Sequence, residues 1–201
     1  MNHYATSPKW AFWKKLAQKR MPIGYQAGLT LNKIERDMVP YQCDWSTAGV
    51  LHIKPKEGFT IEVTERVKTL FMAFIVYSRF AVSGHCDNSL DVHIEVKTTG
   101  SLRKKSICFI SKQPEGQLFI DLINQYPVIR QTLEELDFNR CTISIKNGIW
   151  QCEIEPFTAS EMVSRIPATR RYLRLTQQQR HRLLSALKLV NQLMEIHFAT
   201  D

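Results

Sequence analysis

The stretch CTISIKNGIWQCEIE, from Cys141 to Glu155, decides the fold. At its centre, Asn147-Gly148 is the dipeptide that a type I′ β-turn favours, because both central residues of that turn need positive φ. Apolar and polar residues alternate on both sides of the turn, so one face of the expected hairpin carries Cys141, Ile143, Ile145, Trp150, Cys152 and Ile154. We therefore expect both cysteines to be core residues, since a buried free thiol behaves as a small hydrophobic group; a metal or redox pair is the alternative.

Other stretches also show the alternation of a β-strand. A second hairpin is predicted around Ile53, which would pair with Phe59 across a short loop. Residues 90–97 alternate cleanly, 106–111 would form their partner strand, and 78–84 is a further candidate. These patterns predict an antiparallel sheet of five or six strands.

Helical spacing appears between and after these strands. Residues 65–77 carry apolar side chains at i, i+3 and i+4 spacing, which predicts a buried helix, with a core strand as the alternative. Residues 118–136 are expected to be helical with a break at Pro127, because proline cannot donate a helical hydrogen bond.

Two capping boxes indicate helix starts. Thr158 with Glu161 predicts a short helix that Pro167 ends, and Thr176 with Gln179 predicts the start of a long amphipathic helix near the C-terminus. The predicted fold class is therefore α+β, with an antiparallel sheet built from hairpins, helices packed on it and a long C-terminal helix.

The domain organisation is expected to be simple. No glycine-, serine- or proline-rich run and no block of like charge offers a linker, so residues 1–201 are predicted to form a single domain. Ile-Lys, a turn glycine, a strand and a threonine-started helix occur twice, which makes 50–77 and 141–166 candidate copies of a duplicated hairpin-helix unit.

The cysteines and the apolar runs bear on the compartment. The five cysteines are odd in number and contain no CxxC pair, which disfavours a disulfide framework and a zinc finger. The longest apolar run, at 70–77, is far shorter than the roughly 20 residues that span a bilayer, and no apolar region of a secretory signal follows the N-terminal lysines. We therefore expect a cytoplasmic protein without a transmembrane segment.

Sequence motifs for chemistry are few. Glycine spacing excludes the dinucleotide fingerprint and the P-loop, and neither GxSxG nor HExxH occurs. The best candidates for a metal or thiol site are His85, Cys86, Asp87 and His93, which bring imidazole, thiol and carboxylate groups close together in the sequence. The alternative is that this stretch is a polar turn followed by a strand, and no cofactor is implied.

Basic residues are concentrated near both ends of the chain, whose net charge is +8. Residues 1–34 and 162–194 hold six and seven Lys or Arg respectively, without a single Asp or Glu. The second region contains a candidate anion-binding cluster around the expected start of the last helix, formed by Arg165, Arg170, Arg171, Arg174, Arg180 and Arg182. The alternative is that these arginines pair with acidic residues in the middle of the chain, for example Glu134, Glu135 and Asp137, or simply lie on the solvated surface.

The N-terminal region predicts an amphipathic helix. Trp10, Phe12 and Trp13 would lie opposite Lys14 and Lys15, which is the arrangement of a helix at an anionic membrane surface. A terminal helix that docks on the protein's own sheet is the favoured interpretation, since tryptophan suits that role equally well.

Together these patterns predict a non-catalytic binding protein whose basic ends contact an anionic partner: a nucleic acid backbone, a lipid headgroup or an acidic protein. The first alternative is a peripheral membrane protein that uses the N-terminal helix. The second is a metal- or thiol-dependent enzyme centred on residues 85–93. The apolar face of the last helix leaves a homodimer open.

Overall fold

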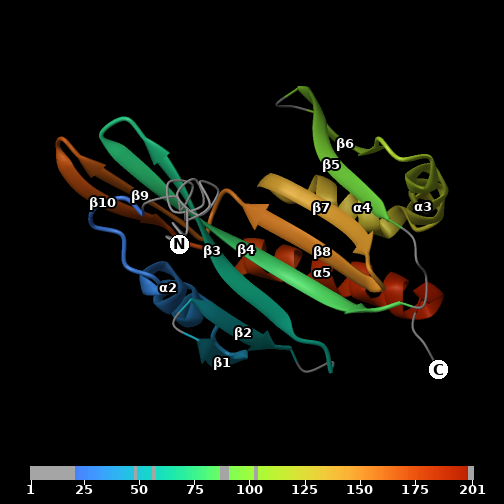
Figure 1. The fold of residues 1–201 in the computed structure, drawn as a ribbon, viewed down its shortest axis with the longest axis horizontal. Coiled ribbons are helices and arrows are strands. Elements are labelled where there is room, and N and C mark those ends of the chain that lie inside the picture. Colours follow the sequence, from blue (N-terminus) through green and yellow to red (C-terminus); the bar gives the residue numbers. More distant parts are fainter. Residues whose placement is uncertain (1–20, 48, 56–57, 87–90, 102–103, 199–201) are drawn as a thin grey trace, which may run out of the picture.

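The computed structural model describes residues 21–47, 49–55, 58–86, 91–101 and 104–198. Its elements follow in the order α2 (Leu29–Asp37), β1 (Gln42–Thr47), β2 (Val50–Lys54), β3 (Ile61–Leu70), β4 (Ala73–His85), β5 (Val92–Ser101), β6 (Lys104–Ser111), α3 (Pro114–Asn124), α4 (Pro127–Glu134), β7 (Phe138–Lys146), β8 (Ile149–Pro156), β9 (Ser160–Arg165), β10 (Ala168–Leu173) and α5 (Gln177–Phe198) (Figure 1). The expected α+β class is confirmed, but the antiparallel sheet has ten strands in the described ranges rather than five or six.

The sheet forks at β4. Its main path runs β1-β2-β3-β4-β8-β7-β5-β6, and β9 and β10 lie off this path. One edge of β4 pairs with β3, whereas the other edge pairs with β9 over residues 73–76 and with β8 over residues 80–85. Strands β3, β4, β9 and β10 therefore form an arm, whose outer end lies at the opposite side of the molecule from α3 (Figure 1).

The core lies between the sheet and the helices. Helix α5 covers one face of β4 and β8, and the buried side chains of helix and sheet belong to one apolar cluster (Figure 1). The hairpin of β7 and β8 confirms the prediction from Asn147-Gly148: Lys146 pairs with Ile149, and both turn residues have positive φ. All six residues expected on its inner face are buried.

The two cysteines of this hairpin are core residues, as expected. Cys141 and Cys152 are 2% and 0% exposed. The hydrogen bond with Cys152 and burial raise the pKa of the Cys141 thiol, so this group stays neutral at physiological pH.

The expected helix at 65–77 is wrong. These residues form the end of β3 and the start of β4, joined by a two-residue turn at Phe71 and Met72. The alternative of a core strand is right about the strand conformation, but the run is a hairpin with an exposed turn rather than one strand. Of the apolar residues in this run, Val67, Phe74 and Val76 are buried together on one face of the arm, on two different strands, so the helical spacing was coincidental.

The expected short helix after Thr158 is also wrong, because residues 160–165 form β9, which pairs with both β4 and β10. The helical halves of the two candidate repeat units, 50–77 and 141–166, are therefore strands. The hairpin of β2 and β3 exists, but Ile53 pairs with Ile61 rather than Phe59. This shift of two residues keeps the same side chains on the core face.

The later helices confirm the sequence patterns more closely. Helix α3 ends before Pro127 and α4 begins at it. The capping box of α5 is reciprocal, since the Gln179 backbone N–H donates to the Thr176 hydroxyl and the Thr176 N–H donates to the Gln179 side chain. Most of the expected apolar face of α5 is buried, although Ile196 is exposed. No helix in the described ranges is long and apolar enough to cross a membrane.

A test of this packing compares two glycines. A Cβ at Gly84 would lie 2.7 Å from Nε1 of Trp150, whereas a Cβ at Gly49 would have no heavy atom within 4 Å. We expect Gly84→Ala to lower the free energy of unfolding by about 1–3 kcal/mol through overpacking. Gly49→Ala should change it by less than about 0.5 kcal/mol. Urea denaturation measures both, and equal effects would contradict the close approach at Trp150.

Candidate functional site

Four of the six arginines in the expected anion-binding cluster are used inside the fold. Arg170 donates to Glu161 and to the Gly24 carbonyl, and Arg174 donates to Asp37 at 2.6 Å. Arg180 donates to the carbonyls of Asp37 and Val39. Arg182 pairs with Glu135 at 3.0 Å, one of the acidic partners suggested by the sequence. These guanidinium groups hold elements together.

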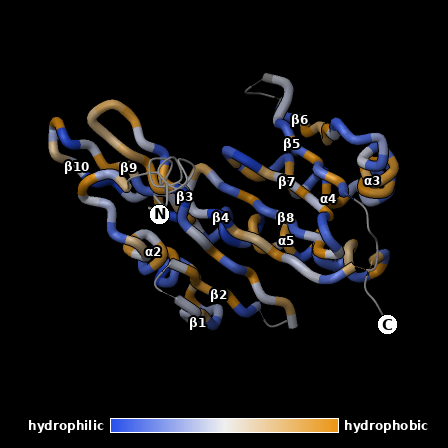
Figure 2. The backbone as a smooth tube through the Cα atoms, in the orientation of Figure 1, coloured by the Kyte–Doolittle hydropathy of each residue, from blue (hydrophilic) through white to orange (hydrophobic). Residues whose placement is uncertain are grey.

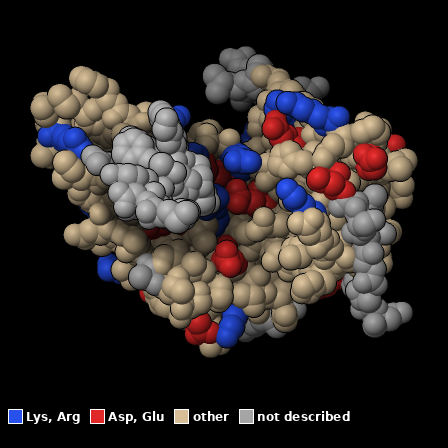
Figure 3. Space-filling model, viewed as in Figure 1, with Lys and Arg blue, Asp and Glu red and all other residues tan. Residues whose placement is uncertain are grey.

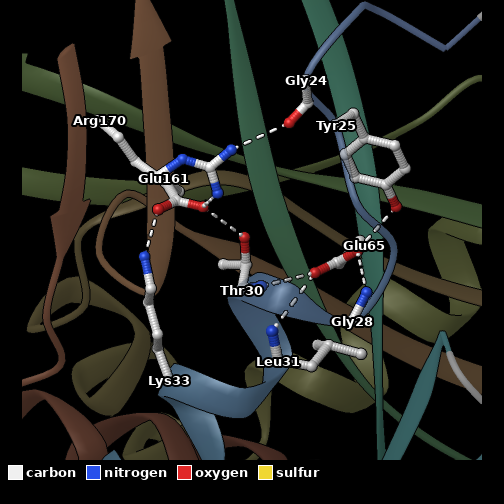
Figure 4. Close-up of polar contacts among 9 residues, drawn as sticks. All are labelled: Gly24, Tyr25, Gly28, Thr30, Leu31, Lys33, Glu65, Glu161 and Arg170. Atoms are coloured by element: carbon white, nitrogen blue, oxygen red, sulfur yellow. Dashed lines mark hydrogen bonds and ion pairs between the residues drawn. The ribbon is translucent and has the colours of Figure 1, made fainter.

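Two carboxylates anchor α2 to the arm (Figure 4). Glu161, only 1% exposed, accepts hydrogen bonds from Thr30, Lys33 and Arg170. Glu65 of β3 accepts from three backbone N–H groups at the start of α2, those of Gly28, Thr30 and Leu31, at 3.0–3.3 Å. Because the first turn of α2 contains no acidic residue, Glu65 supplies the negative charge that a helix N-terminus favours.

A third carboxylate, Asp37, connects the end of α2 to the segment after β10. Besides Arg174, it accepts from the Tyr172 hydroxyl at 2.9 Å and the Leu175 backbone N–H at 3.1 Å. Burial and Asp37 raise the pKa of Tyr172, and burial and Glu65 raise the pKa of Tyr25 in the same way. Both tyrosines therefore keep their protons while the protein is folded.

The other two arginines, Arg165 and Arg171, lie in the hairpin of β9 and β10 and are exposed. Lys68 of β3 is exposed as well. Within the part of the chain that the structure describes, none of these three side chains makes a hydrogen bond or ion pair. The strand registers place Lys68, Ile75, Met162 and Arg171 in one row across β3, β4, β9 and β10. Paired residues share a face, so two cations flank two apolar side chains.

The turns of the two hairpins lie side by side at the outer end of the arm. The Arg165 backbone N–H donates to the Met72 carbonyl at 2.8 Å, and Ala73 pairs with Ser164. Four apolar residues are exposed there, at Leu70, Phe71, Met72 and Ile166. With the three cations Lys68, Arg165 and Arg171 they form what we call the tip surface.

The charged side chains at the outer end of the arm are all positive. Residues 66–75 and 162–174 contain two and four Lys or Arg and no Asp or Glu. Figure 3 shows Lys and Arg but no Asp or Glu at the outer end of the arm, at the left, whereas both signs are mixed over the rest of that view. Figure 2 shows the turn between β3 and β4 as hydrophobic. The tip surface therefore combines exposed apolar groups with unopposed positive charge.

Of the metal or thiol candidates from the sequence, His85 and Cys86 lie at the other end of β4, whereas His93 lies on β5, which is separated from β4 by β8 and β7. His85 and His93 are exposed, Cys86 is 4% exposed, and Asp87 lies outside the described residues. The described ranges contain no group of three or more His, Cys, Asp or Glu that is placed to hold a metal ion.

A hollow of about 680 Å³ beside this end of β4 is lined in part by His52, Glu62, Ser83 and His85. His52 and Glu62 approach to 3.8 Å. Among its described lining residues, no hydroxyl donates a hydrogen bond to a histidine or carboxylate.

The N-terminal candidates Trp10, Phe12, Trp13, Lys14 and Lys15 lie outside the described residues. The sequence patterns missed Lys68 and the turn at Phe71 and Met72, because this stretch was expected to be a helix. The available signal was the lack of any acidic residue from 66 to 75.

The comparisons with known proteins place the chain in a family. A family model described as "Protein of unknown function (DUF3156)" matches residues 36–194. The chain belongs to this family. All residues of the tip surface lie within the span matched by the DUF3156 model. No curated protein and no solved structure matches the chain.

Unfolding measurements test the distinction between the arginines that pair within the fold and the two that are exposed. Arg174→Ala removes the cation beside the buried Asp37, and we expect it to lower the free energy of unfolding by about 1–3 kcal/mol. Arg165→Ala and Arg171→Ala remove exposed side chains and should change it by less than about 0.5 kcal/mol. Because the Arg174 side chain is itself 75% exposed, exposure alone does not account for the difference. A loss in the Arg165 variant equal to that of Arg174→Ala would contradict the assignment.

The raised pKa values of Tyr25 and Tyr172 predict an alkaline transition. An unfolded tyrosine loses its proton near pH 10, whereas these two stay protonated in the folded protein. Their contribution to stability is therefore complete below pH 10 and is lost as the pH rises further. Ultraviolet titration of tyrosinate should show two tyrosines that ionise only on unfolding. Tyr25→Phe and Tyr172→Phe should each remove one, and an unchanged number would refute the prediction.

Proposed function

We propose that the chain is a non-catalytic binding protein that contacts an anionic partner through Lys68, Arg165 and Arg171. The observation that carries this proposal is their arrangement: three exposed cations on two adjacent hairpins, without an acidic residue in 66–75 or 162–174. Their positive charge is directed outward, in contrast to that of the four arginines that pair within the fold.

The electrostatics of this site favour a partner with many negative charges. Each exposed ion pair contributes little by itself, about 0–1 kcal/mol. Several cations on one surface act together, attract an anionic partner and raise its association rate. The interaction should weaken as salt increases, because the screening length falls to about 8 Å at physiological ionic strength.

Heparin serves as a general polyanion probe for this function. We expect Arg165→Glu/Arg171→Glu to elute from a heparin column at clearly lower salt than the wild type. The control is Lys112→Glu/Lys146→Glu, which makes the same change in net charge at exposed positions outside the tip surface. The control should elute close to the wild type. If both double variants elute equally early, binding follows net charge alone and the proposal is wrong.

A further inference from the structure

The apolar residues of the tip surface are unusually exposed for their size. Phe71 is 92% exposed and Ile166 is 70% exposed, while Leu70 and Met72 are 39% and 43% exposed. All four occupy or adjoin the turns of the two hairpins, which lie at the outer end of the arm (Figure 1). They lie together because β4 pairs with β9 up to these turns.

The backbone at Met72 adds an independent observation. Its φ is 58°, in the left-handed region where glycine is favoured and a bulky side chain is uncommon. A glycine or asparagine would suit this turn better for folding alone. The sequence instead places an exposed apolar side chain there, and backbone strain of this kind is concentrated at binding sites and functional turns.

The spacing of charge and apolar surface is also specific. The row that contains Lys68 and Arg171 lies two residues behind the row of Leu70 and Thr169. Two strand residues span roughly 7 Å, and the turn with Phe71 lies beyond that. Interfacial amphipathic helices bury their apolar face about 5–10 Å into the boundary between headgroups and acyl chains, and we take this as the depth for the apolar turns. When the apolar turns reach this depth, Lys68 and Arg171 lie at the level of the headgroups. Arg165 adjoins the turn itself, and its long side chain can reach back to the headgroups.

We infer that the anionic partner is a lipid bilayer with acidic headgroups, which the tip surface enters with its apolar residues while Lys68, Arg165 and Arg171 bind the headgroups. This inference rests on the proposed function and names the partner of the same site. A nucleic acid backbone is bound through its phosphates and leaves the projecting aliphatic residues Leu70, Met72 and Ile166 without a partner. A bilayer satisfies both the charge and the apolar surface.

Vesicle sedimentation tests the inference, with vesicles of phosphatidylcholine alone or mixed with phosphatidylserine. We expect the wild type to bind the mixed vesicles in preference to the neutral ones. Phe71→Ser/Ile166→Ser should bind mixed vesicles at least about tenfold more weakly, because it removes apolar area that becomes buried in lipid. Its elution from heparin should equal that of the wild type. The control Leu118→Ser/Ile196→Ser removes similarly exposed residues of α3 and α5 and should bind like the wild type.

Met72→Gly gives a second readout that a purely structural turn would not. We expect its melting temperature to rise by about 2–4 °C, since glycine relieves the backbone strain, while its affinity for mixed vesicles falls. Higher stability with unchanged vesicle affinity would remove Met72 from the membrane contact.

The outcomes separate the inference from the function on which it rests. If Phe71→Ser/Ile166→Ser binds mixed vesicles like the wild type while Arg165→Glu/Arg171→Glu does not, membrane insertion is refuted and the anion-binding function stands. If Arg165→Glu/Arg171→Glu elutes from heparin like the wild type, the proposed function fails. If the wild type binds duplex DNA but not mixed vesicles, the partner is nucleic acid and the inference is overturned.

Discussion

The double pairing of β4 is the constraint on which the rest of the structure depends. One edge of this strand pairs continuously with β3, but its other edge changes partner from β9 to β8, and residues 77–79 lie between the two. At the fork, the Ser78 hydroxyl and the Nε of Arg79 are buried without a hydrogen-bond partner in the described structure, which is energetically unfavourable. Beside the fork, Arg66 donates two hydrogen bonds to Glu155, which is fully buried, and lies over the Tyr77 ring. Without the fork, the two hairpin turns would not be neighbours.

Ion pairs within the fold determine which arginines of the cluster remain free to contact a partner. Asp37, Glu65 and Glu161 are used to attach α2 to the arm, and they engage Arg170, Arg174 and Lys33 in doing so. A buried carboxylate needs such partners because an uncompensated charge in the interior is unstable. Of the six arginines in the cluster, the two left over are Arg165 at the outer hairpin turn and Arg171 on β10, and no Asp or Glu occurs from 162 to 174. The internal pairing therefore leaves Arg165 and Arg171 as the members of the cluster whose charge faces solvent.

The parts of the fold that the sequence predicts are those set by local chemistry. Asn147-Gly148 needs only its own turn geometry, and the capping box of Thr176 needs only the first turn of α5. The helix expected at 65–77 failed because a short apolar run has no decisive period, and the expected cap at Thr158 was overridden by the pairing of β9 with β4. The arginine cluster was visible in the sequence, but its division was not. Arg174 finds its carboxylate at Asp37, 137 residues away, and no local pattern indicates this contact.

The needs of folding and solubility explain some of the exposed residues of the arm, but not all of them. An edge strand such as β10 needs charges that discourage pairing with other chains, and Arg171 suits that purpose. The same requirement would place polar residues or glycine in the adjoining turns, since an exposed apolar turn increases the tendency to associate. Phe71 is almost fully exposed, so the packing of the fold does not require it, and Met72 occupies a backbone conformation that disfavours its side chain. Folding and solubility therefore explain the arginine but not the exposed apolar residues of the turns, whereas the proposed contact with a surface that is both anionic and apolar accounts for both.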